Sequence, residues 1–249
     1  MQDGIRRPHR LLQTGVAQSS KKPEQLSQNN SMHTWIKICG TTSLEDALSS
    51  IEAGADALGF IFAESKRRVT PEQAQAIIRE LPRKVEKIGV FMNAGAKEIG
   101  RVVKQVKLTG IQMHGDSDIP AEVYRCLPWM RRAVMRKIKT VIVPLPVGEN
   151  FDFHAGVPKF VNTWLLDSGA GSGQTFDWSI ARWQLGGRFA SWPDYVIAGG
   201  LTPENVGEAI RFMVPWGVDV VSGVEREPGR KDPEKLKAFV AAVRRAKQI

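Results

Sequence analysis

The sequence is poor in the residues that define several classes of protein. Only two cysteines occur in 249 residues, Cys39 and Cys126, and they are far apart, which argues against a disulfide framework and for a reducing compartment. Two cysteines and four scattered histidines provide no four-ligand zinc pattern. No apolar run approaches the roughly 20 residues of a membrane-spanning helix. We therefore expect a cytoplasmic protein with no structural metal and no membrane partner.

Acidic residues are also relatively few. The 26 aspartates and glutamates face 35 lysines and arginines, so the formal net charge is +9. A basic surface suits an anionic ligand. No basic patch interleaved with aromatic residues accompanies the charge, and no helix typical of nucleic-acid readers is evident. We expect an anionic small molecule as partner and no nucleic acid.

Residues 1–33 differ in composition from the rest of the chain. They are rich in Gln, Ser, Asn, Lys and Arg and have no sustained apolar period. Such a segment buries too little apolar surface to offset the entropy of ordering, and it lacks the apolar core of a secretory signal. It fits a disordered tail, a misassigned start ahead of Met32, or an organelle transit peptide, and we favour the first two. Residues 34–249 are predicted to form a single domain.

From Trp35 onward, short apolar runs alternate with helix-like segments that have recognisable starts. Capping boxes are predicted at Ser43–Asp46 and Thr70–Gln73, and Thr202 and Asp232, each followed by Pro-Glu, repeat the device. Eight strands separated by helices within about 215 residues favour a (β/α)₈ TIM barrel over an open sheet. The predicted strands are 35–39, 57–62, 85–91, 110–113, 132–138, 163–167, 195–198 and 217–221.

One stretch fits this alternation poorly. Residues 139–162 contain Val-Pro-Leu-Pro-Val-Gly and Gly-Val-Pro, and both sequences break regular structure. We therefore expect the fifth helix to be short or missing.

Polar and reactive residues recur where the predicted strands end, which is where barrels of this type carry their active sites. The motifs are Lys-Ile-Cys-Gly at 37–40, Gly-Val-Phe-x-Asn at 89–93, Gln-x-His-Gly at 112–115, Leu-Leu-Asp at 165–167 followed by Phe-Asp-Trp at 176–178, Gly-Gly-Leu-Thr-Pro-Glu-Asn at 199–205, and Asp-Val-x-Ser-Gly-Val-Glu at 219–225. In this order and spacing, over about residues 35–245, they resemble the phosphoribosylanthranilate isomerase family of tryptophan biosynthesis.

The resemblance implies a (β/α)₈ barrel that isomerises N-(5′-phosphoribosyl)anthranilate to 1-(2-carboxyphenylamino)-1-deoxyribulose 5-phosphate without cofactor or metal. It implies Cys39 as the general base and Asp167 as the general acid. An Amadori rearrangement needs both roles, because the ribose ring oxygen gains a proton and C2′ then loses one. We expect positive surroundings to lower the pKa of Cys39, and apolar or negative surroundings to raise that of Asp167. Cys126 is interpreted as a packing residue.

The resemblance also implies that Arg67 binds the anthranilate carboxylate through a two-pronged hydrogen bond. The adjacent Arg68 leaves the register of this assignment open. Gln112 and His114 lie two residues apart on one predicted strand and therefore share a face. We interpret them as polar pocket residues that bind substrate, and not as metal ligands.

A phosphate site is predicted in the loops after the seventh and eighth strands, where Gly199, Gly200, Ser222 and Gly223 lie. Glycines let backbone N–H groups approach a phosphate, and barrels of this type often bind phosphate there. The family usually has Ser-Ser-Gly where this chain has Val221-Ser-Gly. Val221 weakens phosphate binding if it replaces a contacting hydroxyl, and has no effect if it packs inside the barrel.

Lys37 and Asp219 form a further predicted pair. Lys37 shares its strand face with Cys39, and the eighth strand, which carries Asp219, becomes the neighbour of the first when the barrel closes. Opposite charges inside a barrel are costly unless they pair. We expect an ion pair between them beneath the active site.

Two other functions remain open at this point. The related isomerase of histidine biosynthesis performs the same rearrangement, but with an aspartate pair and no cysteine at the end of the first strand. A non-catalytic binder of phosphorylated metabolites would keep the phosphate loops without needing Cys39 and Asp167. The sequence leaves open whether the protein is a monomer or a homodimer, because the family contains both.

Overall fold

A computed structural model describes residues 33–114, 140–145, 163–167, 178–179 and 194–246. Residues 33–249 form one compact unit. The predicted tail lies outside the described residues except for His33, as does Cys126. Among the helices of the described ranges, none is long and apolar enough to cross a membrane.

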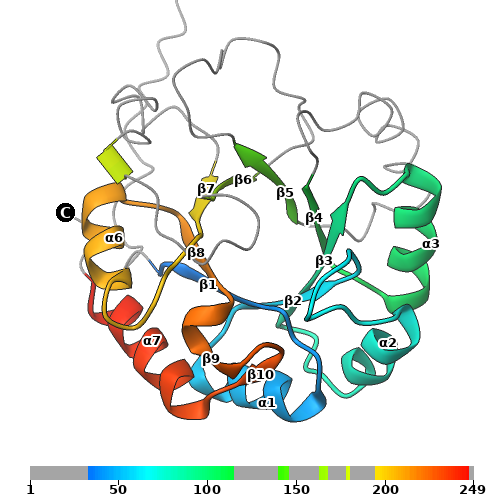
Figure 1. Cartoon of the computed structure of the whole chain (residues 1–249), viewed down its shortest axis with the longest axis horizontal. Helices are drawn as coiled ribbons and strands as arrows, with labels where there is room; N and C mark the ends of the chain where they lie inside the picture. The colour runs from blue at the N-terminus through cyan, green and yellow to red at the C-terminus, as the bar shows by residue number, and fades with distance from the viewer. Residues whose placement is uncertain (1–32, 115–139, 146–162, 168–177, 180–193, 247–249) are drawn as a thin grey trace, which may run out of the picture. The chain divides into compact units, whose positions relative to one another are not determined.

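Eight parallel strands close into a barrel, in which each strand pairs with the next and β8 pairs with β1 (Figure 1). This topology confirms the predicted (β/α)₈ barrel. The strands are β1 (Trp35–Cys39), β2 (Ala57–Ile61), β3 (Glu86–Met92), β4 (Gly110–His114), β5 (Thr140–Leu145), β6 (Thr163–Leu166), β7 (Asp194–Ile197) and β8 (Gly217–Val220).

The fifth strand is the exception to the predicted positions. It is formed by Thr140–Leu145, later in the chain than the predicted 132–138, which lies outside the described residues. Pro144 stands within the strand and faces Leu165 of β6 in the register. The prediction was wrong because the β-branched residues 140–143 favour a strand in spite of the prolines that follow them. The predicted fifth-helix region, 146–162, also lies outside the described residues.

The helices of the described ranges lie outside the strands along part of the barrel, in the order α6, α7, α1, α2 and α3 (Figure 1). Ser43 accepts a hydrogen bond from the Asp46 amide at the start of α1, and Thr70 and Gln73 form the predicted capping box at α2. Asp232 caps α7 as predicted, by accepting from two backbone amides. The bounds are α1 (Leu44–Ala53), α2 (Pro71–Arg79), α3 (Ala96–Val106), α6 (Val206–Met213) and α7 (Pro233–Arg245).

The helix predicted to start after Thr202 begins later. Helix α6 starts at Val206, with Asn205 as its N-cap residue, so the prediction at Thr202 was wrong. The Asn205 side chain accepts from the Thr202 amide at 2.8 Å and donates to the Gly200 carbonyl at 2.9 Å. These two bonds hold residues 200–205 in a turn, and the turn places the β7 loop over the barrel mouth.

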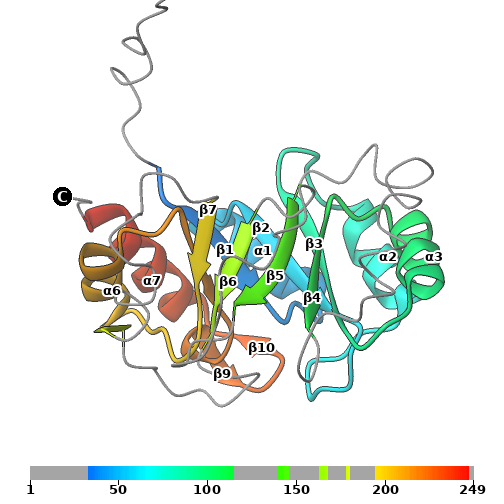
Figure 2. The same ribbon diagram turned by 90° about the horizontal axis from the view of Figure 1, so that it is seen from above.

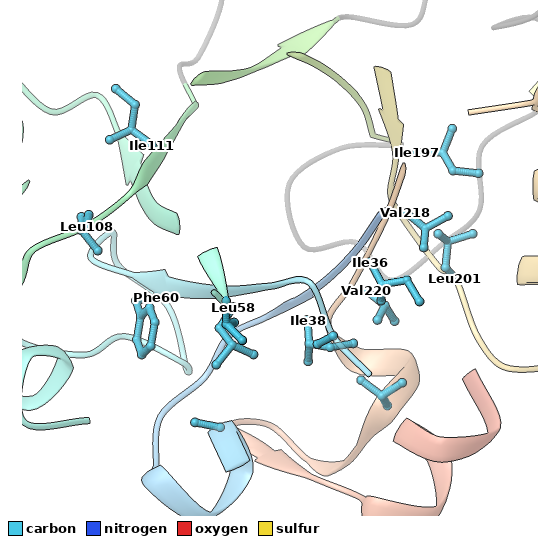
Figure 3. Packing of buried hydrophobic residues seen from close by; sticks show 14 of the residues in the cluster. Ile36, Ile38, Leu58, Phe60, Leu108, Ile111, Ile197, Leu201, Val218 and Val220 are labelled. Atoms are coloured by element: carbon cyan, nitrogen blue, oxygen red, sulfur yellow. The ribbon is translucent and has the colours of Figure 1, made fainter. Parts of the chain in front are cut away.

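Alternation along the strands separates an inner core from an outer one. On β1, Ile36 and Ile38 belong to the outer cluster, which also contains helix residues, whereas Trp35 belongs to an inner cluster. Figure 3 shows Ile36, Ile38, Leu58 and Phe60 on the outer face of β1 and β2. Because successive strand residues point to opposite faces, Lys37 and Cys39 lie on the inner face with Trp35.

The connection from β8 to α7 carries extra structure. A 3₁₀ turn, Ser222–Val224, leads into a hairpin of β9 (Glu225–Glu227) and β10 (Arg230–Lys231). Figure 2 shows this hairpin beyond the end of the barrel toward which the strand arrows point. The hairpin therefore lies at the carboxyl ends of the strands.

Candidate active site

A pocket of about 440 Å³ opens at the carboxyl ends of the strands. It brings together predicted residues from six separate strands or the loops that follow them. Lys37 and Gly223 are not among the residues that line it. The predicted residues that line it are Cys39, Arg67, Gln112, His114, Asp167, Gly199, Gly200, Asp219, Val221 and Ser222.

Cys39 is the last residue of β1, and its side chain is buried at the pocket floor. Gly59 of β2 is its partner in the strand register. A Cβ atom at Gly59 would lie 2.5 Å from the Cys39 Sγ, far inside van der Waals contact. The glycine thus provides the space that the thiol occupies.

The ionisation of Cys39 differs from the sequence expectation. Burial raises the pKa of the thiol, and Asp219 raises it further, while Lys37 and Lys231 lower it. The net shift of the pKa is upward, whereas positive surroundings were expected to lower it. The difference arises because desolvation of a buried thiolate outweighs two nearby cations.

The structure contains the expected ion pair beneath Cys39. The Lys37 Nζ lies 2.6 Å from the Asp219 Oδ2, and the two side chains are 0% and 5% exposed. The residues face each other in the β1–β8 register. Burial alone would lower the pKa of Lys37, but Asp219 and Cys39 outweigh it and raise the pKa. Lys37 is therefore a fixed positive charge under the thiol.

Asp167 directly follows β6 and lines the same pocket. In the barrel, β7 and β8 separate β6 from β1. Asp167 and Cys39 therefore reach the pocket from different parts of its wall, which allows two groups to act on one bound molecule.

Arg67 lies in the loop after β2 and is the arginine that lines the pocket, unlike Arg68. Its Nε donates to Glu225 Oε1 at 2.9 Å, and its NH2 donates to Glu225 Oε2 at 2.7 Å. The hydrogen bond and charge of Glu225 raise the pKa of Arg67. A glycine at position 40, with φ +77°, leaves room for the Arg67 side chain, because a Cβ there would lie 2.8 Å from its Cδ.

Gln112 and His114 share the inner face of β4 and contact each other, with 2.7 Å between Gln112 Nε2 and His114 Nε2. Burial and the charge of Lys37 lower the pKa of His114 to about 4. The imidazole is therefore neutral at neutral pH. Within the described ranges, no group of three His, Cys, Asp or Glu side chains is arranged to hold a metal ion.

The loops after β7 and β8 lie against each other. Gly199 and Gly200 have φ values of +80° and +60°, which favour glycine. A Cβ at Gly223 would lie 1.9 Å from the Leu201 carbonyl oxygen, so only glycine fits this approach. Val221 is half-buried and lines the pocket.

Sequence reasoning missed two charged residues of this region. Glu225 ends the last of the strand-end motifs, which assigns it no role, and no motif contains Lys231. Both are buried, and both are within hydrogen-bond distance of groups that belong to the pocket. A lysine and a glutamate shortly after a strand-end motif are too common in sequences to mark such positions.

Residues 36–242 match the family model described as N-(5′-phosphoribosyl)anthranilate (PRA) isomerase. The chain belongs to this family. The match confirms the resemblance seen in the strand-end motifs. An N-(5′-phosphoribosyl)anthranilate isomerase of Citrifermentans bemidjiense is 42% identical over 220 residues, covering 85% of this chain and 98% of that protein. One of Magnetococcus marinus is 43% identical over 217 residues, covering 85% and 95%.

Solved structures of isomerase family members have the same fold. The phosphoribosyl anthranilate isomerase of Thermus thermophilus aligns with a TM-score of 0.70 and 34% identity, covering 85% of this chain and 98% of that one. A family structure in complex with reduced 1-(o-carboxyphenylamino)-1-deoxyribulose 5-phosphate aligns with a TM-score of 0.66 and 35% identity, covering 85% and 99%. That ligand carries both a carboxylate and a phosphate.

Proposed function

We propose that this chain isomerises N-(5′-phosphoribosyl)anthranilate to 1-(2-carboxyphenylamino)-1-deoxyribulose 5-phosphate in tryptophan biosynthesis, with Cys39 as general base and Asp167 as general acid. Family membership supports the reaction. The observation that carries the residue assignment is that Cys39 and Asp167 line one pocket from different strands.

The reaction needs two proton transfers at different atoms. Asp167 protonates the ribose ring oxygen as the C1′–O bond breaks, which leaves a protonated imine. Cys39, as thiolate, then removes the proton from C2′, and the resulting enolamine tautomerises to the ketone. Each positioned group contributes roughly 10²–10⁴-fold to the rate. Lys37 supports the thiolate, because a fixed cation beside it favours the charged form.

Substrate binding divides between the two ends of the anion. Arg67 holds the anthranilate carboxylate, and the loops with Gly199, Gly200, Ser222 and Gly223 hold the phosphate. The ligand in the complex of the family member carries both groups, which supports this division. Val221 lines the pocket beside Ser222. We therefore propose that the phosphate lacks one hydrogen bond here, because valine has no hydroxyl where the family usually has serine. The partner is an anionic small molecule, and neither a nucleic acid nor a membrane has a role.

The polar pair Gln112–His114 lies at the wall between these ends. A neutral imidazole can accept or donate a hydrogen bond without adding charge. We propose that Gln112 and His114 orient the substrate by hydrogen bonding. The reaction is proposed to use no cofactor and no metal.

The substrate of the histidine-pathway isomerase is the second candidate, since its rearrangement is the same. The cysteine at the end of β1 favours phosphoribosylanthranilate. A monomer and a homodimer both fit the proposal, and one relative, from Thermotoga maritima, is described as a dimeric isomerase.

The test measures the loss of anthranilate-type fluorescence as the purified protein acts on freshly made phosphoribosylanthranilate in the presence of a chelator. Wild type should turn over, and Cys39→Ala and Asp167→Asn should each lower kcat by about 10²-fold or more. Glu98→Gln, at an exposed position of α3, is the control and should act as wild type. No wild-type turnover would refute the proposed substrate, and full activity of either variant would refute its role.

A further inference from the structure

We propose that Glu225 and Lys231, at the two ends of the β9–β10 hairpin, are positioning residues that fix the substrate-binding edge of Arg67 and the backbone of Cys39. The inference rests on the proposed function. It adds to the isomerase a charged triad of Arg67, Glu225 and Lys231, in which Glu225 and Lys231 are buried and Arg67 is half-buried. Arg67 lines the pocket, and Lys231 bonds to the backbone of Cys39.

Glu225 orients Arg67. Its side chain is 3% exposed, and its two oxygens accept from the Nε and NH2 of Arg67 at 2.9 and 2.7 Å. Among the described residues, none accepts from the NH1 of Arg67. A guanidinium has five N–H donors in a planar fork, so the edge that contains NH1 stays available for a second carboxylate. Glu225 thereby holds one edge of the fork and leaves the other for the substrate.

Lys231 holds Glu225 and Cys39 together. Its side chain is 1% exposed, and its Nζ donates to the carbonyl of Cys39 at 2.6 Å, to the carbonyl of Val221 at 3.3 Å and to Glu225 Oε1 at 3.2 Å. The three donors of the ammonium group are all used. Because Cys39 ends β1 and Val221 directly follows β8, Lys231 ties the ends of these two neighbouring strands together and fixes the backbone that carries the thiol.

The charges of the triad match an anionic substrate. Arg67 and Lys231 are two cations around one buried carboxylate, so the triad has one excess positive charge. A substrate carboxylate at Arg67 would balance it. Without Glu225 the two cations would repel each other, and Arg67 would lose the partner that sets its orientation.

The hairpin itself is anchored to the elements that carry the site. Thr42, in the loop after β1, donates to the Gly229 carbonyl at 2.5 Å, and the Gly229 amide donates to Glu225 Oε1 at 3.2 Å. The Lys231 amide donates to Asp46 of α1 at 3.2 Å. The β9–β10 hairpin is therefore a rigid support, and its exposed members Glu227 and Arg230 take no part in these bonds.

The first test separates substrate binding from catalysis. Glu225→Gln should raise KM for phosphoribosylanthranilate by about tenfold or more and change kcat by less than about threefold, because binding is lost equally in the ground and transition states. Inhibition by ribose 5-phosphate, which has no carboxylate, should be unchanged. Glu227→Gln is the matched control and should leave KM unchanged. An unchanged KM in a folded Glu225→Gln protein would overturn the proposal.

A double-mutant cycle tests whether Glu225 acts through Arg67. In an Arg67→Ala background, Glu225→Gln should cause no further rise in KM, whereas independent effects would multiply and contradict the proposal. If Glu225→Gln does not fold, Glu225→Asp serves instead, because it keeps the charge but withdraws it from Arg67 by one methylene. Glu225→Asp must likewise raise KM for phosphoribosylanthranilate with little change in kcat. A weakening of ribose 5-phosphate inhibition by the same factor would overturn the proposal.

The role of Lys231 has a separate readout in the pH profile. The ionisable groups that influence Cys39 are Lys37, Asp219, Lys231 and Arg67. Lys231→Met removes one cation, so the rise of kcat/KM with pH should move to higher pH, while Arg230→Gln should leave the profile in place. An unmoved profile in folded Lys231→Met would overturn this role. Absence of turnover in the wild type would instead refute the proposed function, so the two failures are distinguishable.

Discussion

Gly59 is the residue that determines how much space the thiol of Cys39 has. Its hypothetical Cβ would meet Sγ at 2.5 Å, with the Cys39 backbone at 3.0 Å. Gly59→Ala should therefore displace Sγ within a folded barrel. A misplacement of about 1 Å can cost on the order of 10²-fold in rate, which is the loss of kcat that we expect.

Steady-state kinetics and thermal unfolding check this prediction together. Gly95→Ala provides the control, since a Cβ at Gly95 would meet nothing within 4 Å. Wild-type kcat in Gly59→Ala would show that the thiol has another position from which to act.

The residues of the site were predictable to different extents. Cys39, Arg67, Gln112, His114 and Asp167 line one pocket, which strand-end motifs and the family resemblance could anticipate, because strand ends in a barrel converge on one mouth. Glu225 was not predictable in this way, because its partner Arg67 is 158 positions away and is reached only through the hairpin. The direction in which the pKa of Cys39 shifts could not be predicted from the sequence either, since it depends on the balance between burial and nearby charges.

At the scale of elements, the Lys37–Asp219 pair joins the first strand to the last. Removing one partner leaves a buried charge unpaired, so Asp219→Ala should lower the free energy of unfolding by about 3–5 kcal/mol. Replacing both with apolar residues removes the desolvation cost as well. Lys37→Met with Asp219→Leu should therefore be close to wild type in stability.

Urea denaturation of Lys37→Met, Asp219→Leu and the double variant that combines them measures this coupling. Single costs that simply add in the double variant would contradict a pairwise interaction between β1 and β8. Thr70→Ala, which removes the capping box of α2, is a reference for the size of these changes, because losing such a cap lowers the free energy of unfolding by about 1 kcal/mol.

Element positions were predictable where local signals agreed with the barrel. The first strand was predicted and is found at residues 35–39, because Ile36 and Ile38 favour a strand and Gly40 follows its end. The position of β5 was mispredicted, since Pro144 lies within the strand opposite Leu165 of β6, although proline is rare inside strands. The sequence around Thr202 is typical of a helix cap, but the Asn205 side chain accepts a hydrogen bond from the Thr202 amide, and α6 begins only at Val206. Local patterns fail where a pairing with a neighbouring strand, as at β5, or a competing local hydrogen bond, as at Thr202, determines the structure.

At the scale of the whole chain, the barrel is predicted to fold without the residues before it. The closing strands β1 and β8 and every described pocket residue lie at or after Trp35. A chain that starts at Met32 should therefore keep its melting temperature within about 2 °C and its kcat/KM within about twofold. Circular dichroism and the fluorescence assay measure both. Loss of folding on truncation would show that residues 1–31 are part of the domain.

The pH dependence of stability should reflect His114, which is half-buried in the pocket wall and feels the charge of Lys37. Its pKa is lowered from 6.5 to about 4 in the folded chain. Between these two values the unfolded chain binds a proton that the folded chain does not, so stability rises with pH across this window. The free energy of unfolding should therefore fall as the pH is lowered from 6.5 to about 4, by up to about 3 kcal/mol from this residue.

His114→Gln tests this contribution, because glutamine keeps a polar group on β4 but does not titrate. Urea denaturation of wild type and variant should be compared at pH 4.5, 5.5, 6.5 and 8. At pH 8 His114 is neutral in both the folded and the unfolded chain, so the difference between the two proteins there reports packing and hydrogen bonding alone. Toward pH 4.5 the wild type should lose stability relative to the variant, since only the wild type takes up the extra proton on unfolding. A constant difference across the series would mean that the folded chain protonates His114 as readily as the unfolded one, and that the imidazole is not held neutral in the pocket.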